Sequence, residues 1–226
     1  MANETKDSPV IDIEGTFDRT ERYIEENKKS LLLIVGAVVI LAGGFLGWKY
    51  LYQKPRNEEA AAALFPAETA FAKDSFNLAM NGKGDMMGLI AIADEYGNTP
   101  AGNLANYYLG ICYLNTGKPA QAIEALNEFD ADDKFVGTLA IGLLGDAHME
   151  NKQIDEAISY YLKAAGRESN KFTSPVFLKK AAMAYEDKGN KAEALKLYQQ
   201  IKSEYPDSPE AQSVDKYIYR TGGTVE

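Results

Sequence analysis

The sequence predicts an all-α protein in which a single N-terminal transmembrane helix is followed by an α-solenoid of stacked helical hairpins. An apolar run over residues 31–48 contains no charged residue and predicts the transmembrane helix. Three stretches between residues 109 and 198 share one pattern of small and large side chains, at offsets of 35 and 37 residues. Periods of this length are typical of arrays in which each unit is a pair of antiparallel helices.

The apolar run, LLLIVGAVVILAGGFLGW, is long enough to cross a membrane. An α-helix rises about 1.5 Å per residue, so eighteen residues span roughly 27 Å, and continuation through Tyr52 exceeds the hydrocarbon thickness of about 30 Å. A core helix of a soluble domain would carry a polar stripe, which this run lacks. Thirty residues precede the run and no Ala-x-Ala site follows it, which favours an uncleaved signal anchor over a cleaved signal peptide.

The distribution of basic residues predicts the orientation of this span. Five basic residues precede it and three follow closely, namely Lys6, Arg19, Arg22, Lys28 and Lys29 before, and Lys49, Lys54 and Arg56 after. Nearby positive charge favours the cytoplasmic side, and the Trp48, Tyr50 and Tyr52 cluster fits an aromatic belt at the far interface. We therefore expect residues 1–29 to be a cytoplasmic tail, residues 30–52 the span, and the remainder to lie outside the cytoplasm.

Composition excludes several function classes for the part after the span. Residues 57–226 hold sixteen basic and twenty-five acidic side chains, so the entire net charge of −9 lies there. Such a surface disfavours nucleic acid as a partner. Cys112 is the single cysteine, which excludes an intramolecular disulfide and a four-thiolate zinc site. Its neighbours Tyr108, Leu109 and Tyr113 favour burial, and we expect no cofactor or metal.

The repeated units align at residues 109–126, 144–161 and 181–198. A small residue, then an aromatic residue or histidine, then alanine and finally a large apolar residue recur in register: Gly110, Gly145 and Ala182; Tyr113, His148 and Tyr185; Ala122, Ala157 and Ala194; Leu126, Tyr161 and Tyr198. Small residues let two helices approach closely, and each hairpin leaves an apolar face for the next hairpin to cover. The pattern resembles the tetratricopeptide repeat.

The predicted hairpins are separated by recognisable turns. Residues 116–119 and 188–190 contain Gly117 and Gly189, which can adopt the left-handed conformation that ends a helix. Residues 151–153 serve the middle unit without glycine, and residues 166–174 form a longer connection.

Further helices are expected at both ends of the array. Residues 95–101 match residues 204–209 at a separation of 109, about three repeats, which predicts a degenerate hairpin over residues 57–102 before three repeats over residues 103–206. Its helices are expected over residues 57–80 and 85–96, with these side chains inside the first: Leu64, Phe65, Phe71 and Phe76. Within residues 207–226, a helix from Pro209 to Tyr219 would cap the stack through Val214, Tyr217 and Ile218.

The chain shows no catalytic pattern, and we do not expect an enzyme. His148, the only histidine, occupies a column otherwise filled by Tyr113 and Tyr185, which indicates a core position. A Cys112–His148 dyad would lack an orienting group and an oxyanion site. The glycines around Lys83 do not make a phosphate loop and indicate a turn between helices.

The resemblance to tetratricopeptide repeats implies a concave groove lined by the first helix of each unit. Four positions of each first helix usually face this groove, and they correspond to Leu104, Tyr107, Ile111 and Leu114; Leu139, Gly142, Asp146 and Met149; and Val176, Lys179, Met183 and Glu186. The basic residue and asparagine that clamp a terminal carboxylate in chaperone adaptors are replaced by Tyr107 and Ile111. An apolar groove bearing methionines suits varied peptides or an amphipathic helix. Alternatively, the degenerate hairpin covers part of this stripe.

The whole layout resembles the YfgM-like ancillary subunit of the bacterial Sec translocon. The tail over residues 16–29 resembles that family's juxtamembrane helix. The resemblance implies an inner-membrane protein with a periplasmic repeat domain that associates with Sec translocon subunits and with exported or periplasmic proteins. The alternative that remains open is a scaffold for a cell-envelope assembly or division complex. An enzyme is the weakest of the three hypotheses.

Small residues mark one face of the span. Gly43 and Gly47 lie four residues apart, with Gly36 and Ala37 two turns earlier, which lets another helix approach closely. We expect this face to contact a second copy of the chain or a translocon subunit, although glycine is also frequent in spanning helices.

Overall fold

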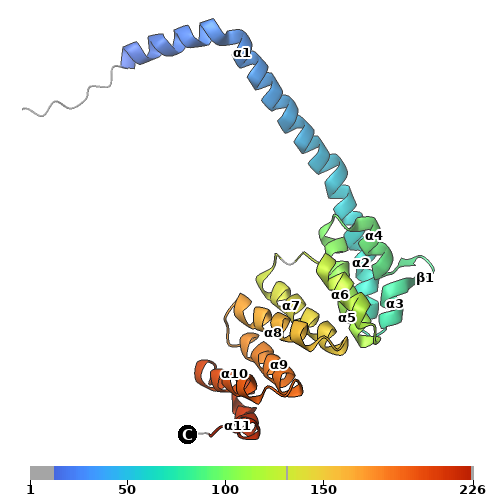
Figure 1. Cartoon of the computed structure of the whole chain (residues 1–226). Helices are drawn as coiled ribbons and strands as arrows, with labels where there is room; N and C mark the ends of the chain where they lie inside the picture. The colour runs from blue at the N-terminus through green and yellow to red at the C-terminus, as the bar shows by residue number, and fades with distance from the viewer. Residues whose placement is uncertain (1–12, 131, 225–226) are drawn as a thin grey trace, which may run out of the picture. The chain divides into compact units, whose positions relative to one another are not determined.

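The computed structural model describes residues 13–130 and 132–224, with side chains from residue 21 onward. The chain divides into two units, Met1–Pro55 and Arg56–Glu226. The expectation of a cytoplasmic tail falls partly on residues 1–12, which lie outside the described residues. Across the part that is described, the fold is helical except for one pair of two-residue strands (Figure 1).

The first unit is built on helix α1 (Ile13–Gly47), which includes the expected juxtamembrane helix and most of the predicted span. A π-helical segment, η1 (Trp48–Gln53), follows and carries the aromatic residues Trp48, Tyr50 and Tyr52, all of them exposed. The apolar helix is long and apolar enough to cross a membrane, and none of its apolar stretch is buried. Single π-turns inside long helices are frequent at functional sites.

The second unit contains the three predicted hairpins. They are α5 (Pro100–Asn115) with α6 (Pro119–Glu128), α7 (Lys134–Glu150) with α8 (Ile154–Arg167), and α9 (Ser174–Asp187) with α10 (Lys191–Glu204). Successive helices pack side by side through the array (Figure 1). Local sequence starts several of them: Thr99 Oγ1 accepts a hydrogen bond from the Gly102 N–H at 3.1 Å, Asp133 caps α7, and Pro100 and Pro119 begin α5 and α6.

The turns within the hairpins occur at the predicted residues. Gly117 and Gly189 have φ of 69° and 81°, the left-handed conformation that glycine adopts without a steric penalty. Lys152 takes the same role in the middle hairpin with φ of 61°.

The column of small residues is confirmed as the place where each hairpin closes. A Cβ atom at Gly110 would collide with the Leu126 side chain, and one at Gly145 with the Tyr161 ring. Ala122, Ala157 and the matching alanine of the third hairpin are fully buried. The closing large residues therefore pack directly on the small ones.

The degenerate hairpin differs from the prediction of one helix over residues 57–80. Helix α2 (Lys54–Phe71) ends nine residues earlier, and residues 72–75 form a turn in which Asp74 has φ of 54°. A short helix α3 (Phe76–Asn81) follows, then strands β1 (Gly82–Lys83) and β2 (Met86–Met87) pair antiparallel before α4 (Leu89–Tyr96). The predicted turn around Lys83 is thus a β-hairpin, and α4 begins four residues later than expected.

Glycine explains the position of this β-hairpin. A Cβ at Gly82 would collide with the backbone of Met86, and one at Gly88 with the backbone of Met80. The two strands can therefore approach only with glycine at both positions.

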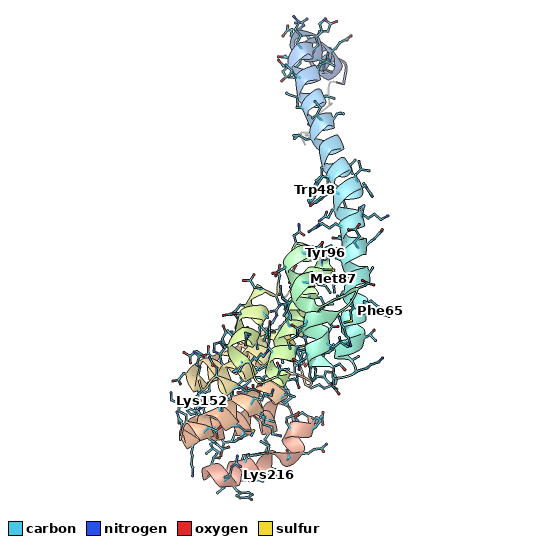
Figure 2. The ribbon with its side chains drawn as sticks, turned by 90° about the vertical axis from the view of Figure 1, so that its right-hand side faces the viewer. Trp48, Phe65, Met87, Tyr96, Lys152 and Lys216 are labelled. Carbon is cyan, nitrogen blue, oxygen red and sulfur yellow. The ribbon has the colours of Figure 1, made fainter. Side chains whose placement is uncertain are left out.

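The apolar side chains expected inside the first helix of the degenerate hairpin are not all buried. Leu64 is 5% exposed and Phe71 packs on Phe76, but Phe65 is 69% exposed. Figure 2 shows Phe65 on the outer side of α2. The prediction of an interior Phe65 is therefore wrong, because this residue follows Leu64 directly and points away from the face that Leu64 buries.

Helix α11 (Pro209–Thr221) covers the open end of the array, as predicted. Val214 and Ile218 are fully buried, and the Tyr217 ring stacks on Tyr198 with ring centroids 5.1 Å apart. Among the residues that the structure describes, buried apolar side chains form one cluster that joins α2 to α6 and another that joins α7 to α11.

Candidate functional site

A groove crosses the first helices of the three hairpins. It consists of two adjoining hollows of about 430 and 270 Å³, which share Ile111, Leu143, Asp146 and Lys180. The larger hollow is also lined by Leu114, Asn115, Met149, Glu150 and Tyr161. The smaller, more apolar hollow is also lined by Tyr107, Leu139, Val176 and Phe177. We refer to this combined surface as the groove.

Most residues that the repeat register predicted for the groove line it in the structure. They are Tyr107, Ile111, Leu114, Leu139, Asp146, Met149 and Val176. Gly142 does not, because it is buried and a Cβ atom there would collide with the Phe177 ring. Leu104 packs instead against the first apolar cluster, and Met183 is 43% exposed outside the lining.

Helix α11 explains why Lys179 and Glu186 do not line the groove. The ammonium group of Lys179 lies 5.4 Å from the centre of the Tyr217 ring, and Glu186 pairs with Arg220. Both partners belong to α11, which therefore occupies the part of α9 that the sequence assigned to the groove. The alternative left open by the sequence, covering by the degenerate hairpin, does not apply to Lys179 and Glu186, whereas Leu104 packs against the buried cluster that this hairpin shares with α5 and α6.

A half-buried polar cluster forms the centre of the groove. Lys180 Nζ donates to both carboxylate oxygens of Asp146 at 2.7 Å, and the Tyr161 hydroxyl donates to the same carboxylate at 2.8 Å. Burial, and next the Asp146 charge, raise the pKa of Tyr161 well above its usual value, so the phenol keeps its proton. Lys180 also lies over the Tyr161 and Phe177 rings. The Asp146 charge is thus neutralised from the next hairpin.

The third hairpin carries the same arrangement outside the groove. Arg220 binds the Glu186 carboxylate through two hydrogen bonds of 2.7 and 2.8 Å, and the Tyr198 hydroxyl donates to it at 2.5 Å. Burial acts to raise the pKa of Glu186, but the hydrogen bonds from Arg220 and Tyr198 outweigh it and hold that pKa below its usual value.

Comparison with known proteins assigns the repeats. One family model described as a tetratricopeptide repeat matches residues 104–132 and 178–208, and a second with the same description matches residues 140–171. The chain carries tetratricopeptide repeats. Each matched segment covers most of one of the three hairpins that line the groove.

Solved structures support the same fold. The TPR-like repeats of a candidate kinesin light chain from Podosopora anserina, in a form with one substituted residue, superpose with a TM-score of 0.51 at 16% identity over 74% of this chain and 84% of that one. A second structure of these repeats gives a TM-score of 0.51 at 15% identity over the same shares. Identities this low show the fold alone, and no curated protein matches the chain.

The sequence analysis missed several residues of the tetratricopeptide groove. Leu143 and Lys180 lie four residues after Leu139 and Val176, so they share a helix face with predicted residues. Widening the predicted stripe to include the residue four positions after the first groove position of each helix would have found them. Tyr161 comes from a second helix, which the four-position rule does not consider.

Some lining residues of the array contribute little to its interior. Ile111, Leu114, Leu143 and Val176 line the groove but belong to neither buried cluster. By contrast, Tyr107 packs on Phe129 with ring centroids 5.3 Å apart, and Met149 packs against the second cluster. The four residues outside the clusters are therefore the ones best placed to contact a partner without also supporting the fold.

Cys112 and His148 are structural residues of the array. Cys112 is fully buried, and burial raises its pKa to about 12. His148 is 9% exposed, stacks on the Tyr160 ring, and has Nδ1 2.9 Å from the Gln153 side-chain oxygen. Both positions agree with the predicted core locations.

Proposed function

We propose that this protein is a membrane-anchored adaptor whose tetratricopeptide groove binds segments of exported proteins beside the Sec translocon. The observation that carries the proposal is the groove itself. It presents the partly exposed side chains of Ile111, Leu114, Leu143 and Val176 from three successive hairpins, and these side chains belong to neither buried cluster. Tetratricopeptide repeats indicate a protein-binding module.

The apolar helix supports the membrane part of the proposal. Its apolar stretch is exposed throughout, which a bilayer accommodates and water does not. The excess of lysine and arginine before the span favours a cytoplasmic N-terminus, and the repeats would then lie in the periplasm. The aromatic residues of η1 fit an interface on that side.

A scaffold for one envelope complex is the second candidate function. Its supporting observation is the Lys180–Asp146 pair in the groove, because fixed polar groups favour one complementary partner over many. Under this alternative the groove would hold one protein permanently, whereas the adaptor would contact several exported proteins in turn.

A photo-crosslinking amino acid at Leu143, introduced into the full-length protein in its native membrane, tests the proposal. The matched control is the same amino acid at Lys163, which is exposed on α8 outside the groove. The adaptor hypothesis expects adducts with translocon subunits and several exported proteins from position 143 only. Adducts with a single envelope complex would support the scaffold, and identical adducts from both positions would refute a role for the groove.

A further inference from the structure

The charged side chains of the groove are not equally available to a partner. Asp146 and Lys180 satisfy each other, and Tyr161 adds a further hydrogen bond. Glu150 lies one turn beyond Asp146 on α7, is exposed, and forms no ion pair with any residue that the structure describes. Glu150 is therefore the charge in the groove lining that is left for a ligand.

The two hollows differ in what they can accept. The smaller one is walled by Tyr107, Leu139, Val176 and Phe177, which favour a bulky apolar side chain. The larger one ends at Asn115 and Glu150, which can accept hydrogen bonds from a donor. Because the hollows share four lining residues, one continuous ligand can occupy both.

We propose that the groove selects an extended peptide segment with a bulky apolar side chain in the smaller hollow and a lysine or arginine beside Glu150. This inference rests on the function proposed above and specifies its ligand. Leu139 and Glu150 are eleven residues apart on α7, which corresponds to about 16 Å along the helix. An extended chain covers that length in about five residues, so the apolar and basic side chains stand roughly three to five positions apart.

The charge of the domain supports a basic ligand. Residues 57–226 carry nine more acidic than basic side chains, which favours the approach of positively charged segments. An acidic ligand, or a free C-terminal carboxylate, would need a cation in the groove. Lys180 is the lysine of the lining and is already bound to Asp146. Repulsion from Glu150 would add to this disadvantage.

Fluorescein-labelled heptapeptides and the detergent-solubilised full-length protein test the inference by fluorescence polarisation. The reference peptide, Gly-Leu-Ser-Ser-Lys-Ser-Gly, has matched versions with glutamate for lysine and serine for leucine, and a longer version adds two serines between leucine and lysine, which gives a spacing of five positions. The lysine peptides should bind roughly three- to fivefold tighter than the glutamate peptide, as an exposed ion pair allows, and high salt should reduce the difference. The serine-for-leucine peptide should bind weakest.

Variants at Glu150 identify the responsible charge. Glu150→Gln should abolish the preference for lysine, and Glu150→Lys should reverse it toward the glutamate peptide. Glu156→Gln is the matched control, because Glu156 is an exposed acid on α8 outside the groove, and it should leave the preference unchanged. Since Glu150 is exposed, none of these changes should affect folding.

The outcomes separate the ligand inference from the proposed function. Equal binding of the lysine and glutamate peptides, lost in a Leu143→Ser, Val176→Ser variant, would overturn the charge selection and retain the groove. Binding that this double variant does not weaken would overturn both. If none of the leucine peptides binds, the selection rule is wrong, and crosslinking from position 143 still decides whether the groove contacts exported proteins.

Discussion

The Lys180 ammonium group and the Asp146 carboxylate join two neighbouring hairpins, with Nζ 2.7 Å from each oxygen. Arg220 and Glu186 repeat this bond at the next interface, again 34 residues apart. In both cases a tyrosine of the intervening second helix donates to the same carboxylate. The first hairpin has Leu126 where the other two hairpins have these tyrosines, so it has no hydroxyl for this hydrogen bond. Its interface with the second hairpin therefore depends more on apolar packing.

The Glu186 interactions predict a specific loss of stability in acid. The pKa of Glu186 is lower in the folded protein than its ordinary value of 4.5, so folding stabilises the ionised form. This contribution is complete above the ordinary value and is lost as the pH falls through the lowered one. Glu186→Gln should therefore lower the midpoint of thermal unfolding at neutral pH, by circular dichroism, and make little difference in strong acid. A difference that grows as the pH falls would contradict this explanation.

Adding a side chain at a glycine where a hairpin closes should destabilise the fold. Gly145→Ala places a Cβ against the Tyr161 ring and should lower the free energy of unfolding by about 1 to 3 kcal/mol. Gly166→Ala is the control, because its Cβ would meet open space within α8, and it should leave the free energy of unfolding unchanged or raise it by up to about 1 kcal/mol. Urea unfolding of the full chain in detergent measures both, and equal effects would show that the hairpin tolerates wider spacing.

Mutations should distinguish the groove residues, which bind a partner, from the core residues, which stabilise the fold. In a variant that combines Leu114→Ser, Leu143→Ser and Val176→Ser, each change should cost less than a core substitution, because these side chains belong to neither buried cluster, and helical content should stay intact while crosslinked partners are lost. Leu126→Ala, in the buried core and away from the lining, should instead cost about 2 to 5 kcal/mol. A groove variant that stays folded and captures every normal partner would place recognition elsewhere.

Cysteine labelling in spheroplasts tests the orientation of the span. A cysteine at Arg22 should react with a membrane-impermeant maleimide only after lysis, whereas one at Lys216 should react in intact spheroplasts. Lys216 is exposed on α11 (Figure 2). Labelling of position 22 alone in intact spheroplasts would reverse the proposed topology.

The glycine face of the span predicts a helix contact. A Cβ atom at Gly43 or Gly47 would meet no other atom within 4 Å, so larger residues fit this helix itself. Gly43→Ile with Gly47→Ile should nevertheless reduce copurification of a membrane partner or a second copy, because the approach of another backbone is blocked. Leu41→Ile, on the opposite face, is the control. Unchanged copurification would place the contact elsewhere.

The repeat register could be predicted from sequence because it follows from packing. Gly110 and Leu126 must meet for a hairpin to close, and this requirement leaves a pattern of small and large residues at fixed spacing. The same register placed Ile111 and Asp146 in the groove. These features repeat, so each unit supports the assignment of the others.

The structure differs from the sequence-based prediction where contacts outside the repeats determine the conformation or occupy a repeat residue. The turn at Asp74 and the strands at Gly82 depend on backbone conformations that apolar periodicity does not encode. Lys179 and Glu186 lie in the correct register, but α11 uses them for its own packing and ion pair. The four groove positions are defined for interior repeats, so they do not predict which residues the capping helix α11 covers.

The burial of Cys112 gives the protein its own reporter of local opening. Because the thiol is fully enclosed and its pKa is raised to about 12, a thiol reagent reacts with it only when the first hairpin opens. The rate of modification of the unaltered chain therefore measures how often that hairpin separates from its neighbours. A ligand that bridges α5 and α7 should slow this reaction, so occupancy of the array can be followed without any introduced label.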